Sequence, residues 1–236
     1  MKKEQKTARI NPETLKLYAD TIKTYRDEIK AGKALHVSIS NANSKMGNVA
    51  SVSLMPGITC PYVNRCKGTC GSECYAAKLC NLRPSVRKAW ARNTAIYQAE
   101  PDRYWEEVNA AIAAVRFFRF HVDGEIISGR YFAGMVESAC RNPGTQILVF
   151  TKRWEVVSAW IDANGALPEN LHVLFSGWEG MQPINPHNLS ETNVYDRHAE
   201  PDPSWLLCGG NCFNCACRGV GCWQAKRGDV IAFEKH

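Results

Sequence analysis

The sequence predicts a mixed α/β fold built around a mainly parallel sheet. Three short apolar segments, 117–122, 146–151 and 171–176, are typical of buried strands, and two segments with helical periodicity, 131–140 and 154–163, lie between them. Strands that alternate with helices of this length pair in parallel through right-handed crossovers. We therefore expect a doubly wound sheet or a barrel, complete or partial.

Three further helices are predicted before the first of these strands. Helical periodicity extends over 12–31, 84–99 and 101–115, and each segment begins with a proline, which the first turn of a helix favours. Segments 35–40 and 49–54 alternate apolar and polar residues around a turn-rich connection. That pattern predicts a β-hairpin after the first helix.

The chain length fits one domain with appendages. Its 236 residues are enough to bury a hydrophobic core. Segment 177–207 is rich in Pro, Asn, Gly and His with little periodicity, which predicts a long loop that serves as a lid or a binding segment. We divide the chain into a helical segment 1–33, an α/β core 34–207 that contains a first cysteine cluster, and a cysteine-rich segment 208–236.

Composition argues against a membrane or secreted protein. Apolar residues make up 45% and charged residues 22% of the chain, and no run approaches the roughly 18 apolar residues of a membrane span. The N-terminus continues with charged residues where a secretory signal would be apolar. We expect a soluble, cytoplasmic protein with no membrane partner. The net charge of +6 is spread along the chain, so it gives only modest support for a phosphate-bearing partner.

Eleven cysteines are the most unusual feature of the composition. Disulfides are rare in the reducing cytosol, so clustered thiols there are more often metal ligands or catalytic groups. Cys140 stands alone on a predicted helix and is expected in the core, while Cys80 and Cys217 are the weakest ligand candidates within the two clusters. The eight predicted ligands are Cys60, Cys66, Cys70, Cys74, Cys208, Cys212, Cys215 and Cys222.

The spacing of these thiols favours iron–sulfur clusters over zinc. Zinc ribbons and fingers usually show two CxxC knuckles, whereas this chain has a single such pair, Cys212 with Cys215. Irregular, glycine-filled spacings with several thiols close together resemble iron–sulfur loops more closely. We expect one or two clusters, of the 4Fe–4S kind, with zinc as the alternative.

Polar side chains at the predicted strand ends are the candidate catalytic residues. His121, Asp123 and Glu125 follow one strand and Lys152 follows the next. Because functional groups gather at the C-terminal ends of parallel strands, these four side chains could meet at one mouth. Structural roles, including capping by Lys152, are the competing interpretation. No GxGxxG, P-loop, GxSxG or HExxH pattern occurs, so dinucleotide, nucleotide-triphosphate, serine-hydrolase and zincin readings lose support.

Several motifs together resemble a known family. They are SLMPGITCP at 53–61, CYA at 74–76, FRFHVDG at 118–124, VFTK at 149–152 and CW at 222–223. With them the chain resembles the phage-associated gene product 88 family from about residue 38 to 223. Members of that family look like distant relatives of radical SAM enzymes, which implies a partial (β/α) barrel with a cysteine loop near its start, and the cytoplasm of a host cell as the location.

The radical SAM resemblance also implies a ligand pattern. Those enzymes typically hold a cluster with three cysteines spaced CxxxCxxC and leave one iron open for S-adenosylmethionine. Here Cys66, Cys70 and Cys74 have a second gap that is one residue longer, and Cys60 is available for the fourth position. A fully ligated cluster would instead transfer electrons or organise structure.

Three functions are compatible with these patterns. The first is a radical SAM-like iron–sulfur enzyme that acts on a nucleotide or nucleic acid, with S-adenosylmethionine as a further ligand and an electron donor protein as a partner. The second is a zinc-stabilised protein that binds nucleic acid or modifies bases. The third is a non-catalytic electron carrier.

Overall fold

In the part of the chain that the structure describes, one eight-stranded sheet forms the centre of the molecule. The computed structural model describes residues 10–60, 70–71, 74–178 and 180–234. The strands lie in the order β1-β2-β3-β4-β5-β6-β8-β7. β1 pairs antiparallel with β2, and every other pairing is parallel. The strands are β1 (Ile39–Ser40), β2 (Ala50–Val52), β3 (Phe117–Phe120), β4 (Gln146–Thr151), β5 (Leu171–Ser176), β6 (Glu191–Tyr195), β7 (Leu206–Leu207) and β8 (Val230–Glu234).

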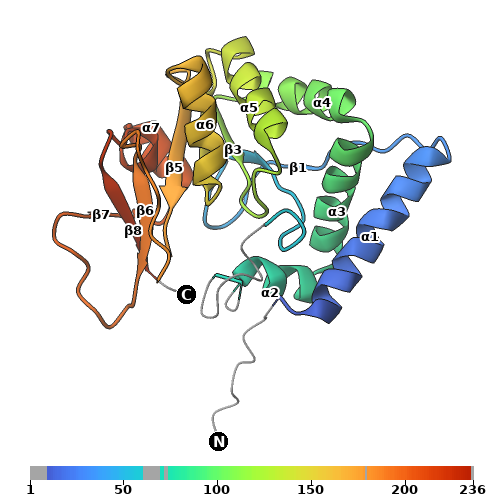
Figure 1. The fold of residues 1–236 in the computed structure, drawn as a ribbon, viewed down its shortest axis with the longest axis horizontal. Coiled ribbons are helices and arrows are strands. Elements are labelled where there is room, and N and C mark those ends of the chain that lie inside the picture. Colours follow the sequence, from blue (N-terminus) through green and yellow to red (C-terminus); the bar gives the residue numbers. More distant parts are fainter. Residues whose placement is uncertain (1–9, 61–69, 72–73, 179, 235–236) are drawn as a thin grey trace, which may run out of the picture.

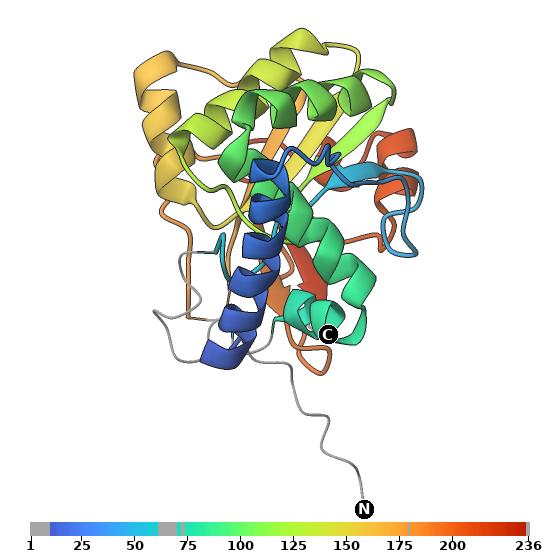
Figure 2. The same cartoon turned by 90° about the vertical axis from the view of Figure 1, so that its right-hand side faces the viewer.

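Helices cover the sheet unequally (Figures 1 and 2). The main hydrophobic core joins one face of β2 to β5 to the apolar sides of α4, α5 and α6. A smaller cluster joins α1 to α2 and α3, and a third lies on the opposite face of the sheet under α7 and η1. The helices are α1 (Pro12–Lys30), α2 (Tyr75–Leu82), α3 (Pro84–Ala99), α4 (Pro101–Ala113), α5 (Gly129–Arg141), α6 (Trp154–Asn164), α7 (Cys212–Arg218) and the 3-10 helix η1 (Gly221–Trp223).

The central strand β3 shows why both faces of the sheet are covered. Phe118 and Phe120 are fully buried in the core under the helices, whereas Phe117 belongs to the cluster on the opposite face. Successive side chains of a strand point to opposite faces, so Arg119 also faces the side of α7. An apolar strand of this kind requires cover on both sides.

The predicted α/β alternation is confirmed, and β4 and β5 occupy the predicted ranges 146–151 and 171–176. The hairpin of β1 and β2 and the helices that begin at Pro12, Pro84 and Pro101 are also confirmed. Among the described residues no pairing joins β1 to β7, so the sheet is open and no closed barrel forms. The parallel strands β2 to β6 follow one another in chain order, so the sheet winds in one direction from β2 to β6.

The prediction of a long loop over 177–207 was wrong, because this range contains β6 and β7. Only Thr192 of the five residues in β6 is buried, so the strand lacks the apolar run that marks β4 and β5. Pairing with β5 and β8 sets its position. Segment 208–236 supplies α7, η1 and also β8, which lies within the same sheet between β6 and β7. The division of the chain at residues 33 and 207 stays a prediction.

A tight turn presses the end of β3 against the end of β2. His121 donates from its backbone N–H to the Val52 carbonyl oxygen at 2.9 Å, and Leu54 donates to the Asp123 carbonyl oxygen at 3.1 Å. Gly124 has φ +89, and a Cβ on it would lie 2.7 Å from the Leu54 carbonyl oxygen. This turn therefore requires glycine both for its backbone conformation and for its space.

We expect Gly124→Ala to lower the free energy of unfolding by about 2 kcal/mol or more, because the new methyl group meets backbone and the positive φ disfavours a side chain. Gly144→Ala is the matched control, since nothing lies within 4 Å of a Cβ there and its φ is not positive. Urea unfolding followed by circular dichroism measures both. Equal free energies of unfolding in the two variants would contradict the requirement for glycine at position 124.

Candidate functional site

Glu125 joins the C-terminal ends of β3 and β4. One carboxylate oxygen accepts hydrogen bonds from the Ile126 N–H at 2.8 Å and the Thr151 hydroxyl at 2.6 Å, and the other accepts from the Lys152 N–H at 2.7 Å. Its own N–H donates to the Thr59 hydroxyl at 3.0 Å. Burial raises the pKa of Glu125, while these hydrogen bonds oppose the shift. Both carboxylate oxygens are engaged in hydrogen bonds. Among the four predicted catalytic residues, Glu125 therefore has a structural role.

Lys152 links the ends of β4 and β5. Its ammonium group donates to the Ser176 hydroxyl at 2.7 Å and lies 5.9 Å from the centre of the Trp178 ring. The side chain is half-buried, so it keeps hydrogen-bonding capacity toward solvent. A cation placed at the strand ends in this way suits an anionic group of a bound molecule.

Asp123 differs from Glu125 because the described residues give its carboxyl group no well-formed hydrogen bond. The residue is only 5% exposed, and neither carboxyl oxygen is paired among the described residues. Burial raises its pKa to about 7, although the nearby Tyr75 hydroxyl and Arg119 act to lower it. The Tyr75 hydroxyl itself donates to the Val122 carbonyl oxygen at 2.5 Å. Asp123 can therefore gain or lose a proton near neutral pH, as a general acid or base does.

His121 faces the helices that cover the sheet. Its Nε2 lies 2.9 Å from the Tyr131 hydroxyl of α5, which lies 2.7 Å from the Tyr104 hydroxyl of α4. Its Nδ1 is buried and has no partner in the described part of the chain, and its φ is +54. Burial, followed by the Arg119 charge, lowers the pKa of His121 to about 3, so the ring is neutral at physiological pH.

The first cysteine cluster lies beside these strand ends. Burial and then the charge of Glu125 raise the pKa of Cys60, and the Cys74 and Cys70 thiols add to this effect. Burial raises the pKa of Cys74 to about 11, although the backbone N–H groups of Ala77 and Ala76, at the start of α2, donate to its sulfur and act to lower it. The fourth predicted ligand, Cys66, lies outside the described residues.

The two cysteines that were judged weak ligands, Cys80 and Cys217, have different surroundings. Cys80 is fully buried in the cluster formed with Tyr18, Ile22 and Met55, and burial raises its pKa to about 12. Cys217 lies on α7 and is exposed. Cys140 was expected in the core, but it is exposed on α5, so that prediction was wrong.

The second cluster encloses a cavity on the opposite face of the sheet. Its lining combines aromatic and glycine residues with all four predicted ligands, Cys208, Cys212, Cys215 and Cys222. Gly210 donates its N–H to the Cys208 sulfur at 3.5 Å, and the Gly209 N–H donates to Cys215. Burial and the neighbouring thiols raise the pKa of Cys222 to about 12. Four ionised thiols in this space would therefore require a cation among them.

Arg119 supplies one positive charge to this cavity. Its Nη1 lies 3.8 Å from the Cys212 sulfur and 3.6 Å from the Met46 sulfur, and its guanidinium group lies 4.5 Å from the centre of the Phe150 ring. Its Nε is buried without a hydrogen-bond partner, and the described residues give it no carboxylate in an ion pair. Sequence analysis missed Arg119; the available signal was one charge inside the aromatic strand FFRF.

Within the described ranges, no group of three or more His, Cys, Asp or Glu side chains is arranged to hold a metal ion. The thiols of the second cluster border a common cavity, but no three of them are placed to bind one metal ion. Of the four predicted catalytic residues, Glu125 and Lys152 are directly joined, Asp123 lies near Cys74 and Tyr75, and His121 contacts the tyrosines of α4 and α5. Tyr75 was not predicted, although it directly follows Cys74.

Together, the fold and these sites define an α/β protein with an open, mainly parallel sheet and two cysteine-rich regions on different sides of it. The family model of gene product 88 matches residues 14–222, so the chain belongs to the gene product 88 family. No curated protein and no solved structure matches the chain. None of the helices in the described ranges has the length and apolar character needed to cross a membrane.

We expect Asp123→Asn to stabilise the protein at pH 8. The usual pKa of the carboxyl group is 3.8 and that in the fold is about 7, so its ionisation opposes folding above pH 7. This cost disappears as the pH falls from 7 toward 4, because the folded state takes up the proton first. The variant should gain on the order of 3 kcal/mol at pH 8 and little at pH 4. Unfolding free energies at both pH values test this, and an equal gain at both would contradict it.

We expect the neighbouring substitution Glu125→Gln to act in the opposite direction. The amide group of glutamine would place a donor against one of the N–H or hydroxyl donors that the carboxylate now accepts. Loss of stability by about 2 kcal/mol is expected at pH 8, since a buried donor is left without an acceptor. Chemical unfolding of Glu125→Gln and Asp123→Asn under the same conditions gives the comparison. An unchanged free energy of unfolding in Glu125→Gln would show that the hydrogen bonds of Glu125 between β3 and β4 are unimportant for stability.

Proposed function

We propose that this protein is an iron–sulfur enzyme with two cysteine-held sites. The first site, at the strand ends, is proposed to perform radical SAM-like chemistry on a nucleotide or nucleic acid, and the second to hold an auxiliary cluster. The four thiols that share one cavity with the half-buried Arg119 are the observation that carries this proposal.

The charge of Arg119 supports an anionic occupant of the second site. The guanidinium Nε is buried, and the described residues give Arg119 no carboxylate in an ion pair, so negative charge nearby would lower the cost of burying this group. Thiolates bound to metal carry that charge at neutral pH, whereas free thiols with raised pKa values do not. The N–H groups of Gly209 and Gly210, directed at sulfur, would further stabilise thiolate ligands.

The arrangement of the thiols favours a cluster over zinc. Four thiolates on one zinc must approach a single point at about 2.3 Å. Each thiolate of a 4Fe–4S cluster binds a different iron, so the sulfur atoms surround a larger volume. Thiols that border a common cavity, but are not placed to hold one ion, fit the second description better. Cys208, Cys212, Cys215 and Cys222 would hold this cluster.

The first site is proposed to be the reactive one, with Cys60, Cys66, Cys70 and Cys74 as its ligand candidates. A cluster with one open iron would supply the electron for cleavage of S-adenosylmethionine there. The cysteine segment follows β2, the first strand of the parallel series, as the radical SAM resemblance implies. The consecutive order of β2 to β6 is compatible with a partial barrel of that kind.

The other residues of this site have roles that follow from their contacts. Asp123 would hold or accept a proton at its unpaired carboxyl group. Lys152 would bind an anionic group of the substrate, and Glu125 would position Lys152 by accepting from its backbone N–H. The neutral His121 would hold the turn against α5 through the Tyr131 hydroxyl. The cation at Lys152 and the net charge of +6 favour a phosphate-bearing substrate.

We expect the anaerobically purified chain to contain iron and sulfide in equal amounts and to absorb broadly near 400 nm. Cys215→Ser should lose about half of the iron if two clusters are present, because it removes a ligand from the second cavity. Cys217→Ser is the matched control, since this exposed thiol lies on the same helix outside the cavity and should leave the iron content unchanged. Metal and sulfide analysis with visible spectra measures all three proteins.

The same preparations separate the alternatives. Zinc without iron would overturn the proposal and leave a zinc-stabilised nucleic-acid protein. Iron that is reduced and reoxidised reversibly, without cleavage of S-adenosylmethionine after chemical reduction, would indicate an electron carrier. Cleavage that is lost in Cys74→Ser but kept in Cys80→Ser would support the assignment of the first site, because Cys80 belongs to the core.

A further inference from the structure

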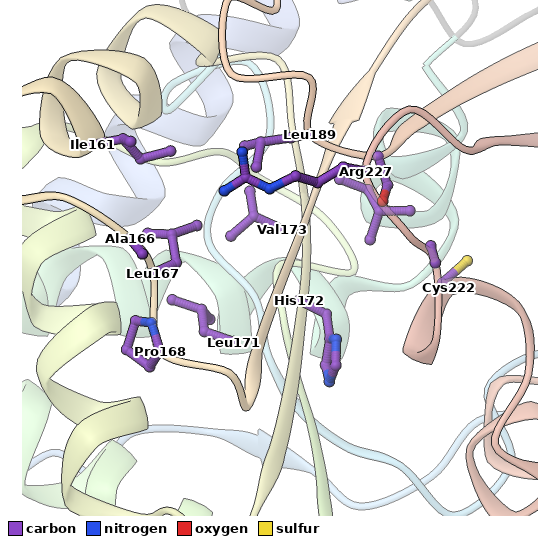
Figure 3. Close-up of a pocket in the computed structure, with 13 residues that line it drawn as sticks. Ile161, Ala166, Leu167, Pro168, Leu171, His172, Val173, Leu189, Cys222 and Arg227 are labelled. Carbon is purple, nitrogen blue, oxygen red and sulfur yellow. The ribbon is translucent and has the colours of Figure 1, made fainter.

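A cavity lies where β5 and β6 separate. The two strands pair only through Phe175 with Glu191 and Ser176 with Thr192, so the first four residues of β5 have no neighbouring strand on that side. The space holds a cavity of about 180 Å³ (Figure 3). Ile161, Leu167 and Leu189 belong to the helix-covered face of the sheet, whereas Cys222 and Ala225 belong to the face of α7. The cavity therefore passes through the plane of the sheet.

The backbone N–H and C=O of Val173 point toward this cavity. Phe175 and Gly177 donate to the Ser190 and Thr192 carbonyl oxygens, so odd-numbered residues here direct their N–H and C=O groups toward β6. Val173 is 6% exposed, and the pairing of β5 with β6 begins at Phe175, so no residue of β6 stands opposite Val173. A buried donor beside a buried acceptor requires a complementary pair of groups inside the cavity.

A positive charge lies over the same space. Figure 3 shows the Arg227 side chain reaching across the cavity near Val173 and Leu189. One guanidinium N–H donates to the His187 carbonyl oxygen at 3.0 Å, and Arg227 has no carboxylate in an ion pair among the described residues. A guanidinium group carries five N–H donors, so several stay available to an anion.

We propose that this cavity binds a nucleoside monophosphate, separately from the strand-end site. A nucleobase presents an acceptor next to a donor on one edge, which matches the N–H and C=O of Val173. The side chains of Ile161, Leu167 and Leu189 contact the face of the base on the helix-covered side of the sheet, and Arg227 binds the phosphate. Because Cys222 lines both cavities, the nucleotide lies beside the second cysteine site. The site does not require those cysteines to hold iron.

The test is equilibrium dialysis of the full chain with adenosine 5′-monophosphate, adenosine and ribose 5-phosphate. The monophosphate should bind most tightly, because each of the other two lacks one recognised half. Arg227→Gln should weaken binding of the monophosphate about tenfold, as expected for loss of a charge-assisted contact to phosphate. Lys226→Gln, the adjacent exposed cation outside the cavity, should change it less than about twofold. Ala225→Phe, which fills the cavity, should abolish binding.

Three outcomes would overturn the proposal. The first is absence of binding by the unaltered chain, and the second is equal weakening by Arg227→Gln and Lys226→Gln. The third is loss of binding in Lys152→Gln with no change in Arg227→Gln, which would place the nucleotide at the strand ends. Iron content is measured on each preparation, so failure of this proposal is distinct from failure of the iron–sulfur assignment.

Discussion

Between the ends of β3 and β4, the carboxylate of Glu125 accepts three hydrogen bonds in a place that water does not reach. The turn at Gly124 brings it there, and its own N–H reaches back to Thr59, just before Cys60. The strand ends, the entry to the first cysteine segment and the backbone of Lys152 thus depend on one buried anion. Each hydrogen-bond partner of Glu125 is a neutral donor, so all of them are needed together to stabilise the buried carboxylate.

Strand β3 and the turn after it lie between the two cysteine-rich regions, because successive side chains of the strand point to opposite faces of the sheet. Arg119 points to the face of the second cavity, while Phe118 and Phe120 support the helices. The charge of Arg119 nevertheless adds to the lowering of the pKa of His121 by burial, and it opposes the rise that burial causes in the pKa values of Asp123 and Cys222. One half-buried guanidinium group therefore influences the ionisation of both regions, which is a consequence of the short rise per residue in a strand.

Sequence patterns predicted those parts of the fold in which burial is complete. β4 and β5 have apolar runs because both of their faces are covered, and their bounds were predicted correctly. β6 is mostly half-buried and β8 follows a cysteine-rich segment, so neither has a recognisable periodicity, and pairing alone defines them. Thiol density marked the candidate ligands, and Asp123 was found as a strand-end carboxylate. The contrast between paired Glu125 and unpaired Asp123 depends on contacts across the fold, which spacing cannot reveal.

The position of β8 has a consequence for biosynthesis. This strand follows all the cysteines in the chain, yet it lies between β6 and β7. A ribosome therefore releases every thiol of the second cavity before the residues that complete this half of the sheet. During that interval, α7 lacks the packing contacts that Ile231 and Phe233 provide in the hydrophobic cluster beneath it. The second cavity is therefore complete only after β8 has joined the sheet, because Ile231 and Phe233 of that strand are part of its lining.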